Sequence, residues 1–132
     1  METAIAAAVH AAGVEAWTWF TAHPPEDAAL LRRACPAARV YLSVATEPRW
    51  VADLDQAIAV AAARGLHGIN PSHDALDAAL VARAHARGLA VGAWTVDEPA
   101  AIERALDLGV DMITTNVPRR VFAAIAARAA RG

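Results

Sequence analysis

Hydrophobic positions along this chain fall into short runs separated by longer segments with helical spacing. The clearest case lies between Gly88 and Pro118, where an apolar run over Leu89–Val96 precedes a segment whose apolar residues share one helical face. Gly109 ends that predicted helix, and Val110–Thr114 begins a second apolar run. A strand, a helix and a strand within about thirty residues form a βαβ unit, whose strands are parallel and whose crossover is right-handed.

The start of the helix in this unit carries its own signals. Asp97 is placed to accept hydrogen bonds from the free amides of a following helix, and Pro99 suits a first turn, where a missing N–H costs nothing. We therefore predict Asp97 as the cap of this helix.

The same alternation recurs through the chain and predicts one α/β domain over residues 1–132, with parallel strands and crossover helices. The predicted strands are Val14–Phe20, Arg39–Ala45, Leu66–Asn70, Leu89–Val96 and Val110–Thr114. The predicted helices run from Ala4 to Ala12, from Pro24 to before Pro36, from Pro48 to Arg64, from Ser72 to before Gly88, from Asp97 to before Gly109, and from Pro118 to the end. The count is five strands and six helices, with no linker that would indicate a second domain.

Composition limits the function without naming it. The chain is 57 % hydrophobic, mostly through alanine, and all of its basic residues are arginine. A net charge of -2 with interleaved signs gives no general attraction to nucleic acid. The single cysteine, Cys35, cannot form an internal disulfide and is expected to be a small packed residue in a reducing compartment. The apolar amino terminus is too short to span a bilayer and lacks a basic leader region, so we expect a cytoplasmic protein.

In parallel α/β folds, ligands bind at the carboxyl ends of the strands, because the loops there converge and the following helix starts point at the site. The expected rim contains Phe20, Asn70, Trp94 and Asn116. Helix starts at Ser72, Asp97 and Pro118 offer free amides, which would favour an anion such as phosphate.

Each chemical candidate also has a structural explanation. Asp97 and Glu98 are explained as a helix cap and as stabilisation of the helix dipole. Several histidines, tryptophans and arginines can likewise be explained by structure rather than by function. We expect His73 in a solvated first turn, His10 and His85 on outward helix faces, His67 as a hydrogen-bonded core histidine, Trp17 and Trp19 in the core, Trp50 as a helix-start anchor, and Arg119 and Arg120 as an exposed charge patch. His23 and Glu47 also lie at the expected rim but show no metal-ligand spacing.

Several short motifs together resemble the glycerophosphodiester phosphodiesterase family. They are Trp94-Thr95-Val96, Gly109-Val110-Asp111 followed by Ile113, Thr115 and Pro118, then Ile69-Asn70-Pro71 with His73, and Ala84-His85 with Gly88-Leu89. Trp19-Phe20 stands where the family has a Ser-Phe pair. Two departures are visible: Asp97 replaces the usual Asn, and Asn116 replaces the usual Asp.

The resemblance implies a (βα)8 barrel that hydrolyses glycerophosphodiesters in lipid metabolism, a phosphoric diester hydrolase fold of the phospholipase C-like type. The family uses two histidines and a divalent cation, Mg or Ca, held by carboxylates. Its His-Arg-Gly, Glu-x-Asp and Glu-x-Lys motifs are absent here, and the chain has no lysine. This chain therefore corresponds to strands four to eight, a partial TIM barrel without the catalytic residues or the metal ligands. The resemblance implies substrate contacts for Trp94, Phe20, Asn70 and Asn116.

Three interpretations stay open at this point. The chain is the carboxyl-terminal part of a phosphodiesterase and inert alone, or a non-catalytic module that binds a phosphate or polyol or completes a barrel, or a different small α/β enzyme that shares only this ending. Five strands with two unpaired edges predict a partner, which is either a second copy or the missing amino-terminal half.

Overall fold

The computed structural model describes residues 1–44 and 53–132, and within them the alternation of strands and helices forms one parallel sheet. The strands are β1 (Trp19–Ala22), β2 (Arg39–Val44), β3 (Gly68–Pro71), β4 (Ala90–Ala93) and β5 (Met112–Ile113), paired in chain order. The helices are α1 (Glu2–Ala11), α2 (Pro25–Ala34), α3 (Leu54–Ala63), α4 (Ala78–Ala86), α5 (Pro99–Leu108) and α6 (Pro118–Arg131), with short 3-10 helices η1 (Glu15–Trp17) and η2 (His73–Ala75). The predicted partial barrel is confirmed.

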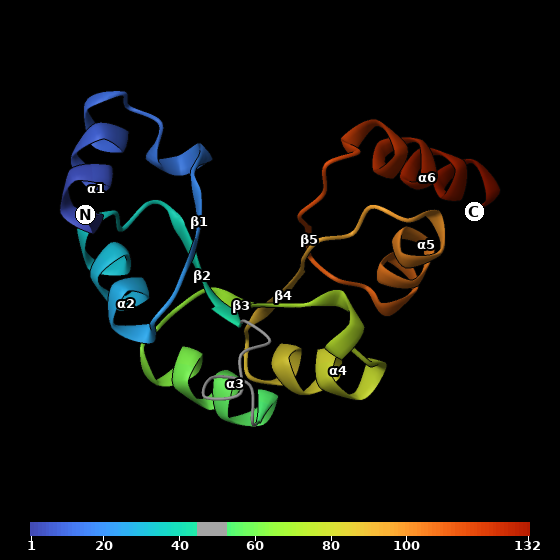
Figure 1. Ribbon diagram of the computed structural model, residues 1–132, viewed down its shortest axis with the longest axis horizontal. Helices are drawn as coiled ribbons and strands as arrows, with labels where there is room; N and C mark the ends of the chain where they lie inside the picture. The colour runs from blue at the N-terminus through green and yellow to red at the C-terminus, as the bar shows by residue number, and fades with distance from the viewer. Residues whose placement is uncertain (45–52) are drawn as a thin grey trace.

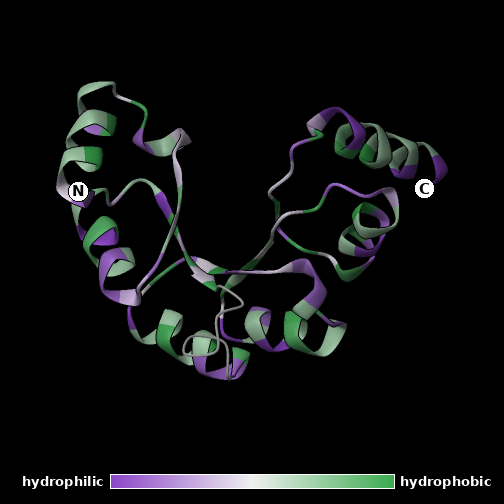
Figure 2. Ribbon diagram, viewed as in Figure 1, coloured by the Kyte–Doolittle hydropathy of each residue, from purple (hydrophilic) through white to green (hydrophobic). Residues whose placement is uncertain are grey.

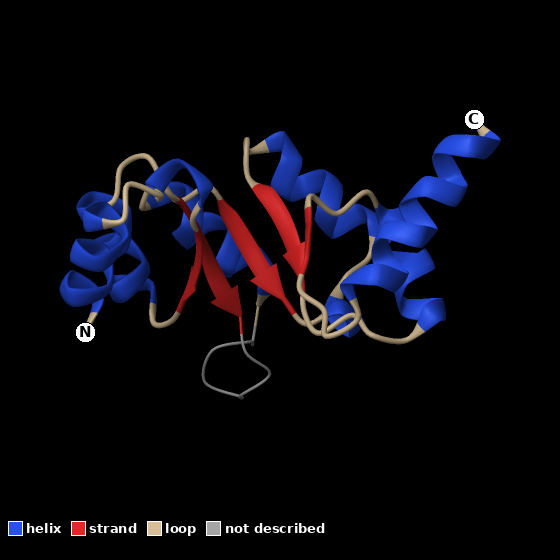
Figure 3. Ribbon diagram, turned by 90° about the horizontal axis from the view of Figure 1, so that it is seen from above, coloured by secondary structure: helices blue, strands red, loops and turns tan. Residues whose placement is uncertain are grey.

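The sheet curves into an arc, with the helices along its outer side (Figure 1). The view from above shows the strands running alongside one another between the helices (Figure 3). The amino terminus and α1 lie at one end of the arc, while α6 and the carboxyl terminus lie at the other (Figure 1). Each end therefore presents an edge strand: within the described residues, β1 pairs only with β2, and β5 only with β4.

The two faces of the sheet have different chemistry, because side chains alternate along each strand. The face toward the helices is aliphatic, with Val40, Leu42, Ile69 and Val91 all buried in the main core. Each outer helix combines hydrophobic and hydrophilic residues, as expected for helices that cover a sheet on one side only (Figure 2).

The opposite, inner face carries polar, aromatic and glycine residues. The strand register places Tyr41 beside Gly68, Ser43 beside Asn70, and Gly92 beside Met112 on this face. Within the described residues, the helices lie on the outer side and leave the inner face uncovered, so a ligand would enter from the inner side (Figure 1).

Most helix boundaries agree with prediction within a few residues. The helix after Pro99 ends at Leu108, and Gly109 adopts a left-handed conformation with φ of 70° as its C-cap. A left-handed residue is inexpensive for glycine, since it lacks a Cβ. The last helix begins at Pro118 as predicted.

The predicted strand Val14–Phe20 is wrong. Residues Glu15–Trp17 form η1 instead, and the strand begins at Trp19 and continues to Ala22. Trp17 is 87 % exposed and Trp19 is also exposed, so the prediction of two core tryptophans is wrong as well. The aromatic alternation that suggested a buried strand belongs to a segment at the end of the arc, where no neighbouring strand covers it.

The predicted helix start at Ser72 and the predicted helix cap at Asp97 are also wrong. Ser72 makes no capping hydrogen bond. The fourth helix starts later, after Asp77, whose Oδ1 accepts from the Leu80 amide at 2.7 Å. Asp97 does not cap α5 either, because Glu98 occupies the N-cap position and the Asp97 carboxylate binds elsewhere. The N-cap is the residue at which the chain enters the helix. The spacing of residues in the sequence did not show where that entry occurs.

The described part of the third helix begins at Leu54 and is capped by Asp53, whose Oδ1 accepts from the Asp55 amide at 2.9 Å. The predicted start at Pro48, the anchor role of Trp50 and the rim residue Glu47 lie outside the described residues.

Candidate functional site

The carboxyl ends of the strands meet along one rim of the arc, and three of the four predicted site residues lie there. Asn70 is near the end of β3, Trp94 follows β4, and Asn116 follows β5. Because parallel strands end on the same side, residues from separate βα units come close only here.

Trp94 is held in place by three neighbours. Its amide donates to the Pro71 carbonyl at 3.2 Å, its carbonyl accepts from the His73 amide at 2.9 Å, and its indole N–H donates to the Asn70 carbonyl at 2.9 Å. With the indole N–H engaged, the partly exposed side chain offers an apolar ring rather than a hydrogen-bond donor. A fixed ring of this kind suits the carbon skeleton of a small polyol.

The Asn70 side chain is polar yet only 3 % exposed. Its Oδ1 has no hydrogen-bond partner among the described residues. This oxygen lies against Gly92, where a Cβ would approach it to 2.5 Å. Most buried polar atoms are paired, so an acceptor without a donor on the ligand-entry face is an unusual feature.

Asp97 and Asn116 form the third part of the rim. Asp97 Oδ1 accepts from the Thr115 hydroxyl at 2.9 Å and from the Asn116 amide at 2.7 Å, and Asp97 Oδ2 accepts from Asn116 Nδ2 at 2.8 Å. These hydrogen bonds, with that of Asn116 the largest contribution, lower the pKa of Asp97. The carboxylate therefore joins the loop after β4 to the loop after β5.

This arrangement changes the expectation of an anion site at the start of α6. The Asn116 amide donates to Asp97, and the Val117 amide donates to the Thr115 hydroxyl at 3.0 Å. The Asp97 carboxylate and the Thr115 hydroxyl already accept from these two amides, and the negative charge of Asp97 repels a second anion.

Phe20 is not at the rim. It pairs in register with Val40 in the first half of β2, and it packs against both hydrophobic clusters on the helix-covered face. The late start of β1 explains the difference, because the strand ends at Ala22 rather than at Phe20. The structure thus separates Phe20 from Trp94, Asn70 and Asn116.

His73 lies in η2, not in the first turn of a long helix, and its side chain is largely buried beside Asp74, with Nδ1 3.3 Å from Oδ1. The loop that holds it is tied down from α5: Arg104 Nη1 donates to the His73 carbonyl at 2.9 Å, and Arg104 Nη2 donates to the Leu76 carbonyl. His73 is therefore part of a fixed loop next to Trp94.

Three other histidines have structural partners. His67 Nδ1 accepts from the Val40 amide at 3.0 Å, and burial lowers its pKa, as do the charges of Arg32 and Arg39. This confirms the expectation of a satisfied histidine. His10 Nδ1 lies 2.5 Å from Glu15 Oε1, and His85 Nε2 lies 2.8 Å from Asp111 Oδ2.

These side chains do not fit a divalent cation. Within residues 1–44 and 53–132, no three His, Cys, Asp or Glu side chains gather closely enough to hold a metal ion. Asp97, an acid at the rim, is already bound by Thr115 and Asn116. No helix in the part of the chain that the structure describes is long and apolar enough to cross a membrane.

Comparison with known proteins decides the family. The model of the glycerophosphoryl diester phosphodiesterase family matches residues 6–120. The chain belongs to this family. Comparison with curated proteins gave no match.

Solved structures of phosphodiesterases share the fold. A proposed glycerophosphoryl diester phosphodiesterase from Silicibacter pomeroyi DSS-3 is 30% identical with a TM-score of 0.76, and the match covers 92% of this chain and 41% of that chain. A proposed enzyme of the same name from Agrobacterium tumefaciens str. C58 is 28% identical with a TM-score of 0.79, with coverage of 96% and 50%. A phosphodiesterase from Oleispira antarctica in complex with the product sn-glycerol-3-phosphate is 19% identical, with a TM-score of 0.60 and coverage of 82% and 41%. This chain thus spans about half the length of the structures it matches.

A direct contact explains why Asp97 and Asn116 both depart from the family motif. Asp97 and Asn116 hydrogen-bond each other through both side-chain oxygens of Asp97. An Asn at the first position and an Asp at the second could form the same side-chain contact with donor and acceptor exchanged. The sequence contained this signal, since the two departures are reciprocal, but only the fold showed that the residues touch.

Proposed function

We propose that this chain is the carboxyl-terminal scaffold of a glycerophosphodiester-cleaving hydrolase and that it is inactive alone. The observation that carries the proposal is the match to the phosphodiesterase family by a half-barrel that spans about half of its structural neighbours. The role in glycerophospholipid metabolism and the cytoplasmic location belong to the same proposal.

Cleavage of a phosphodiester requires an acid for the leaving group, a base or nucleophile, and positive charge to balance the phosphoryl oxygens. The described rim supplies none of these as a set, because Asp97 is bound by Thr115 and Asn116 and no metal-binding cluster exists among the described residues. The histidines, the acids and the Mg or Ca ion of the family chemistry would therefore come from polypeptide outside these 132 residues.

The contribution of this half is to shape the substrate pocket. Trp94 presents a fixed apolar ring for the glycerol carbons, and Asn70 Oδ1 is an acceptor for a hydroxyl group of the same moiety. Asn116 lies at the outer rim, where Asp97 orients its amide. The Oleispira antarctica enzyme was solved in complex with sn-glycerol-3-phosphate, and a pocket of this kind would bind the same type of molecule.

The test is an activity assay of the purified chain with a glycerophosphodiester and Mg or Ca. The chain is assayed alone and again with the part of the Silicibacter pomeroyi protein outside the matched segment. We expect no release of glycerol 3-phosphate by the chain alone. Metal-dependent release by the chain alone, lost on Trp94→Ala but not on Trp17→Ser, would overturn the proposal.

A second candidate function is a non-catalytic module that binds a phosphate or polyol. The Asn70–Trp94 pair favours it, since both groups are positioned within this chain alone. Titration calorimetry with glycerol 3-phosphate and with glycerol separates the two functions. Binding that Asn70→Ala abolishes supports the module, whereas no heat with either ligand supports an inert scaffold.

A further inference from the structure

The position of Trp94 at the rim depends on the loop that follows β3. The Trp94 indole N–H donates to the Asn70 carbonyl, and the Trp94 amide donates to the Pro71 carbonyl. The Trp94 carbonyl accepts from the His73 amide, and Ser72 forms a parallel bridge with Trp94. Because these contacts come from residues 70–73, a shift of that segment would move the indole ring.

The hydrogen bonds within this loop are few and weak. η2 has three residues, and in this turn the Ala75 amide donates to the Ser72 carbonyl at 3.1 Å and the Leu76 amide donates to the His73 carbonyl at 3.3 Å. Short 3-10 helices have poor hydrogen-bond geometry, and the carbonyls at the end of a helix lack intrahelical partners. The loop can therefore be stabilised by a donor from outside.

Arg104 supplies two such donors from α5. Its Nη1 donates to the His73 carbonyl at 2.9 Å, and its Nη2 donates to the Leu76 carbonyl. The guanidinium is a planar fork of N–H groups, so one side chain can bind two carbonyls that lie three residues apart. A charged donor also makes a stronger hydrogen bond than a neutral one. Arg104 thus closes the turn of η2 from outside the loop.

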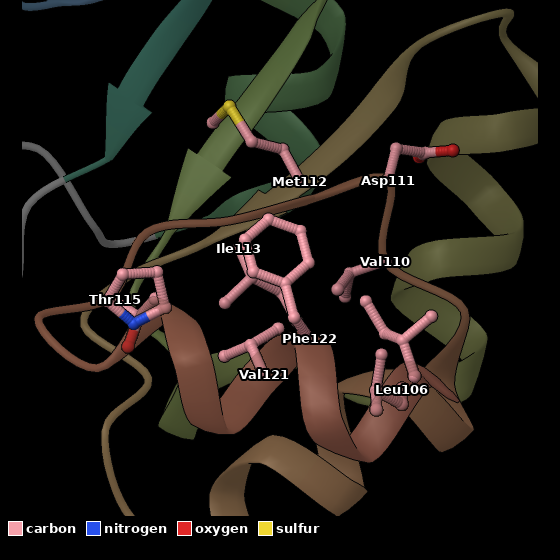
Figure 4. Close-up of a pocket in the computed structure, with 10 residues that line it drawn as sticks. Leu106, Val110, Asp111, Met112, Ile113, Thr115, Val121 and Phe122 are labelled. Atoms are coloured by element: carbon pink, nitrogen blue, oxygen red, sulfur yellow. The ribbon is translucent and has the colours of Figure 1, made fainter. Parts of the chain in front are cut away.

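The backbone of Arg104 is held firmly, because α5 packs on the sheet and on α6. Ile102 and Ala105, on either side of Arg104 in the sequence, are buried in the main core, whereas Arg104 is exposed. On the side toward α6, Leu106 and Val121 line the same apolar pocket (Figure 4). Arg104 therefore connects a fixed helix to a loop that is weakly held.

Arg32 makes the same kind of contact at the opposite edge of the sheet. Its Nε donates to the Gly65 carbonyl at 3.1 Å, and its Nη1 donates to the Pro36 carbonyl at 3.2 Å. Gly65 precedes β3 and Pro36 precedes β2, so these contacts lie at the amino ends of the strands, whereas Trp94 follows the carboxyl end of β4. Arg32 is therefore a matched control for Arg104.

We propose that Arg104 is a positioning residue for Trp94: it fixes the loop after β3, and this loop fixes the indole ring at the rim. Without the fork, η2 opens locally more often, and the Asn70 carbonyl holds the indole N–H less of the time. What the ring does for a substrate rests on the proposed function, but its placement by Arg104 does not.

Hydrogen exchange of the Trp94 indole N–H, followed by proton–nitrogen NMR, tests this placement. The signal is identified by its loss in Trp94→Phe. Arg104→Met keeps a long side chain and removes the donors, so the indole N–H should exchange at least about fivefold faster. Arg104→Lys keeps the charge without the fork and should give an intermediate rate.

Arg32→Met removes a comparable pair of hydrogen bonds far from the rim. It should leave the exchange rate of the Trp94 indole within about twofold of the unmodified chain. Neither arginine belongs to the hydrophobic core, so circular dichroism should show that all of these variants fold.

Two results would overturn the proposal. Unchanged exchange in Arg104→Met would show that the loop holds Trp94 without the fork. Equal acceleration in Arg32→Met and Arg104→Met would show a general effect on stability instead of a local one. The proposed function is tested separately, by activity and by titration with glycerol 3-phosphate, and its failure would not alter the exchange of the Trp94 indole.

Discussion

Single residues on the inner face show how the sheet accommodates large side chains. Tyr41 lies over Gly68, and Asn70 lies over Gly92, each across a neighbouring strand. Tyr41 and Asn70 are almost fully buried although no helix of the described chain covers this face. A glycine in a strand weakens the strand itself, but it leaves room for the adjacent side chain to lie flat.

Replacing these glycines should have unequal effects. A Cβ at Gly92 would meet side-chain atoms, Asn70 Oδ1 at 2.5 Å and Met112 Cε at 2.8 Å, whereas a Cβ at Gly68 would meet the Ala90 carbonyl oxygen at 2.2 Å. Gly92→Ala should lower the free energy of unfolding by about 1–3 kcal/mol, and Gly68→Ala should lower it more, because backbone cannot rotate away. Urea unfolding measures both.

A double substitution serves as the control. Asn70→Ala removes one obstacle, so adding Gly92→Ala to it should cost less than Gly92→Ala alone. Equal costs in the two backgrounds would show that Asn70 does not restrict the position of residue 92.

The Asp97–Asn116 contact gives a second prediction at this scale. Asp97→Asn leaves two amides facing each other, Asn116→Asp leaves two carboxylates, and the double exchange restores one of each. Thermal melts at neutral pH should show both single variants less stable than the double variant, with Asn116→Asp the least stable through charge repulsion. Additive effects in the double variant would contradict a direct contact.

The pH dependence of Asp97 follows from its lowered pKa. Hydrogen bonds from Asn116 hold the folded-state pKa below the ordinary value of 3.8. The carboxylate therefore contributes stability above that value, and the contribution is lost as the pH falls through the lower folded-state pKa. Unfolding midpoints measured between neutral pH and strong acid should fall less steeply for Asp97→Asn than for the unmodified chain.

Helices are joined to their neighbours by arginine–acid pairs on the outer surface. Arg64–Glu26 is a single contact, while Arg128 Nη2 reaches Glu103 Oε2 at 2.6 Å, the Glu103 carbonyl at 3.0 Å and Asp107 Oδ1 at 2.8 Å. Glu103 and Asp107 accordingly raise the pKa of Arg128. Because exposed ion pairs contribute little to the free energy of unfolding, we expect these pairs to orient α3 and α6 rather than to stabilise the fold.

We expect Arg64→Gln to change the free energy of unfolding by no more than about 1 kcal/mol, and Arg128→Gln to have the larger effect. Urea titrations at low salt test the order, and repeating them at about 1 M sodium chloride should shrink the difference. An Arg64 effect larger than the Arg128 effect would contradict the structural ranking.

The packing of α1 over Cys35 can be tested by the reactivity of the thiol. The thiol is fully buried, its Sγ lies 3.8 Å from the Ala6 carbonyl oxygen, and burial raises its pKa. Labelling by a disulfide reagent should therefore be slow in the folded chain and fast in urea. Ala6→Asp, which buries a carboxylate under α1 and so weakens the packing that covers Cys35, should accelerate labelling, whereas the exposed Ala8→Asp should not.

On the scale of the whole molecule, an arc with two open ends is less well buried than a closed barrel. A partner that covers these ends, either a second copy or the rest of a barrel, stabilises the folded state by mass action. If the partner is a second copy, the melting temperature should rise with protein concentration, and Trp17→Ser should reduce that rise. A concentration-independent melt for the unmodified chain would count against coupling between folding and association.

Much of the molecule was predictable because its signals are local. The alternation of apolar runs and helical segments gave six helices and five parallel strands, and Pro118 and Gly109 marked helix ends through their own backbone preferences. Trp94, Asn70 and Asn116 were predicted at the rim, since strand ends in a parallel sheet meet there.

Local sequence signals gave wrong predictions for three residues, Phe20, Trp17 and Asp97. Whether Trp17 is core or surface depends on a neighbouring strand that is not next to it in sequence, and whether Asp97 caps α5 or binds Asn116 depends on a contact across nineteen positions. The alternation, the parallel topology and the family could be read from the sequence, because they rest on periodicity, glycine and proline geometry, and motifs. Which side chains meet and which remain exposed required the folded structure, because such contacts depend on how separate βα units come together in space.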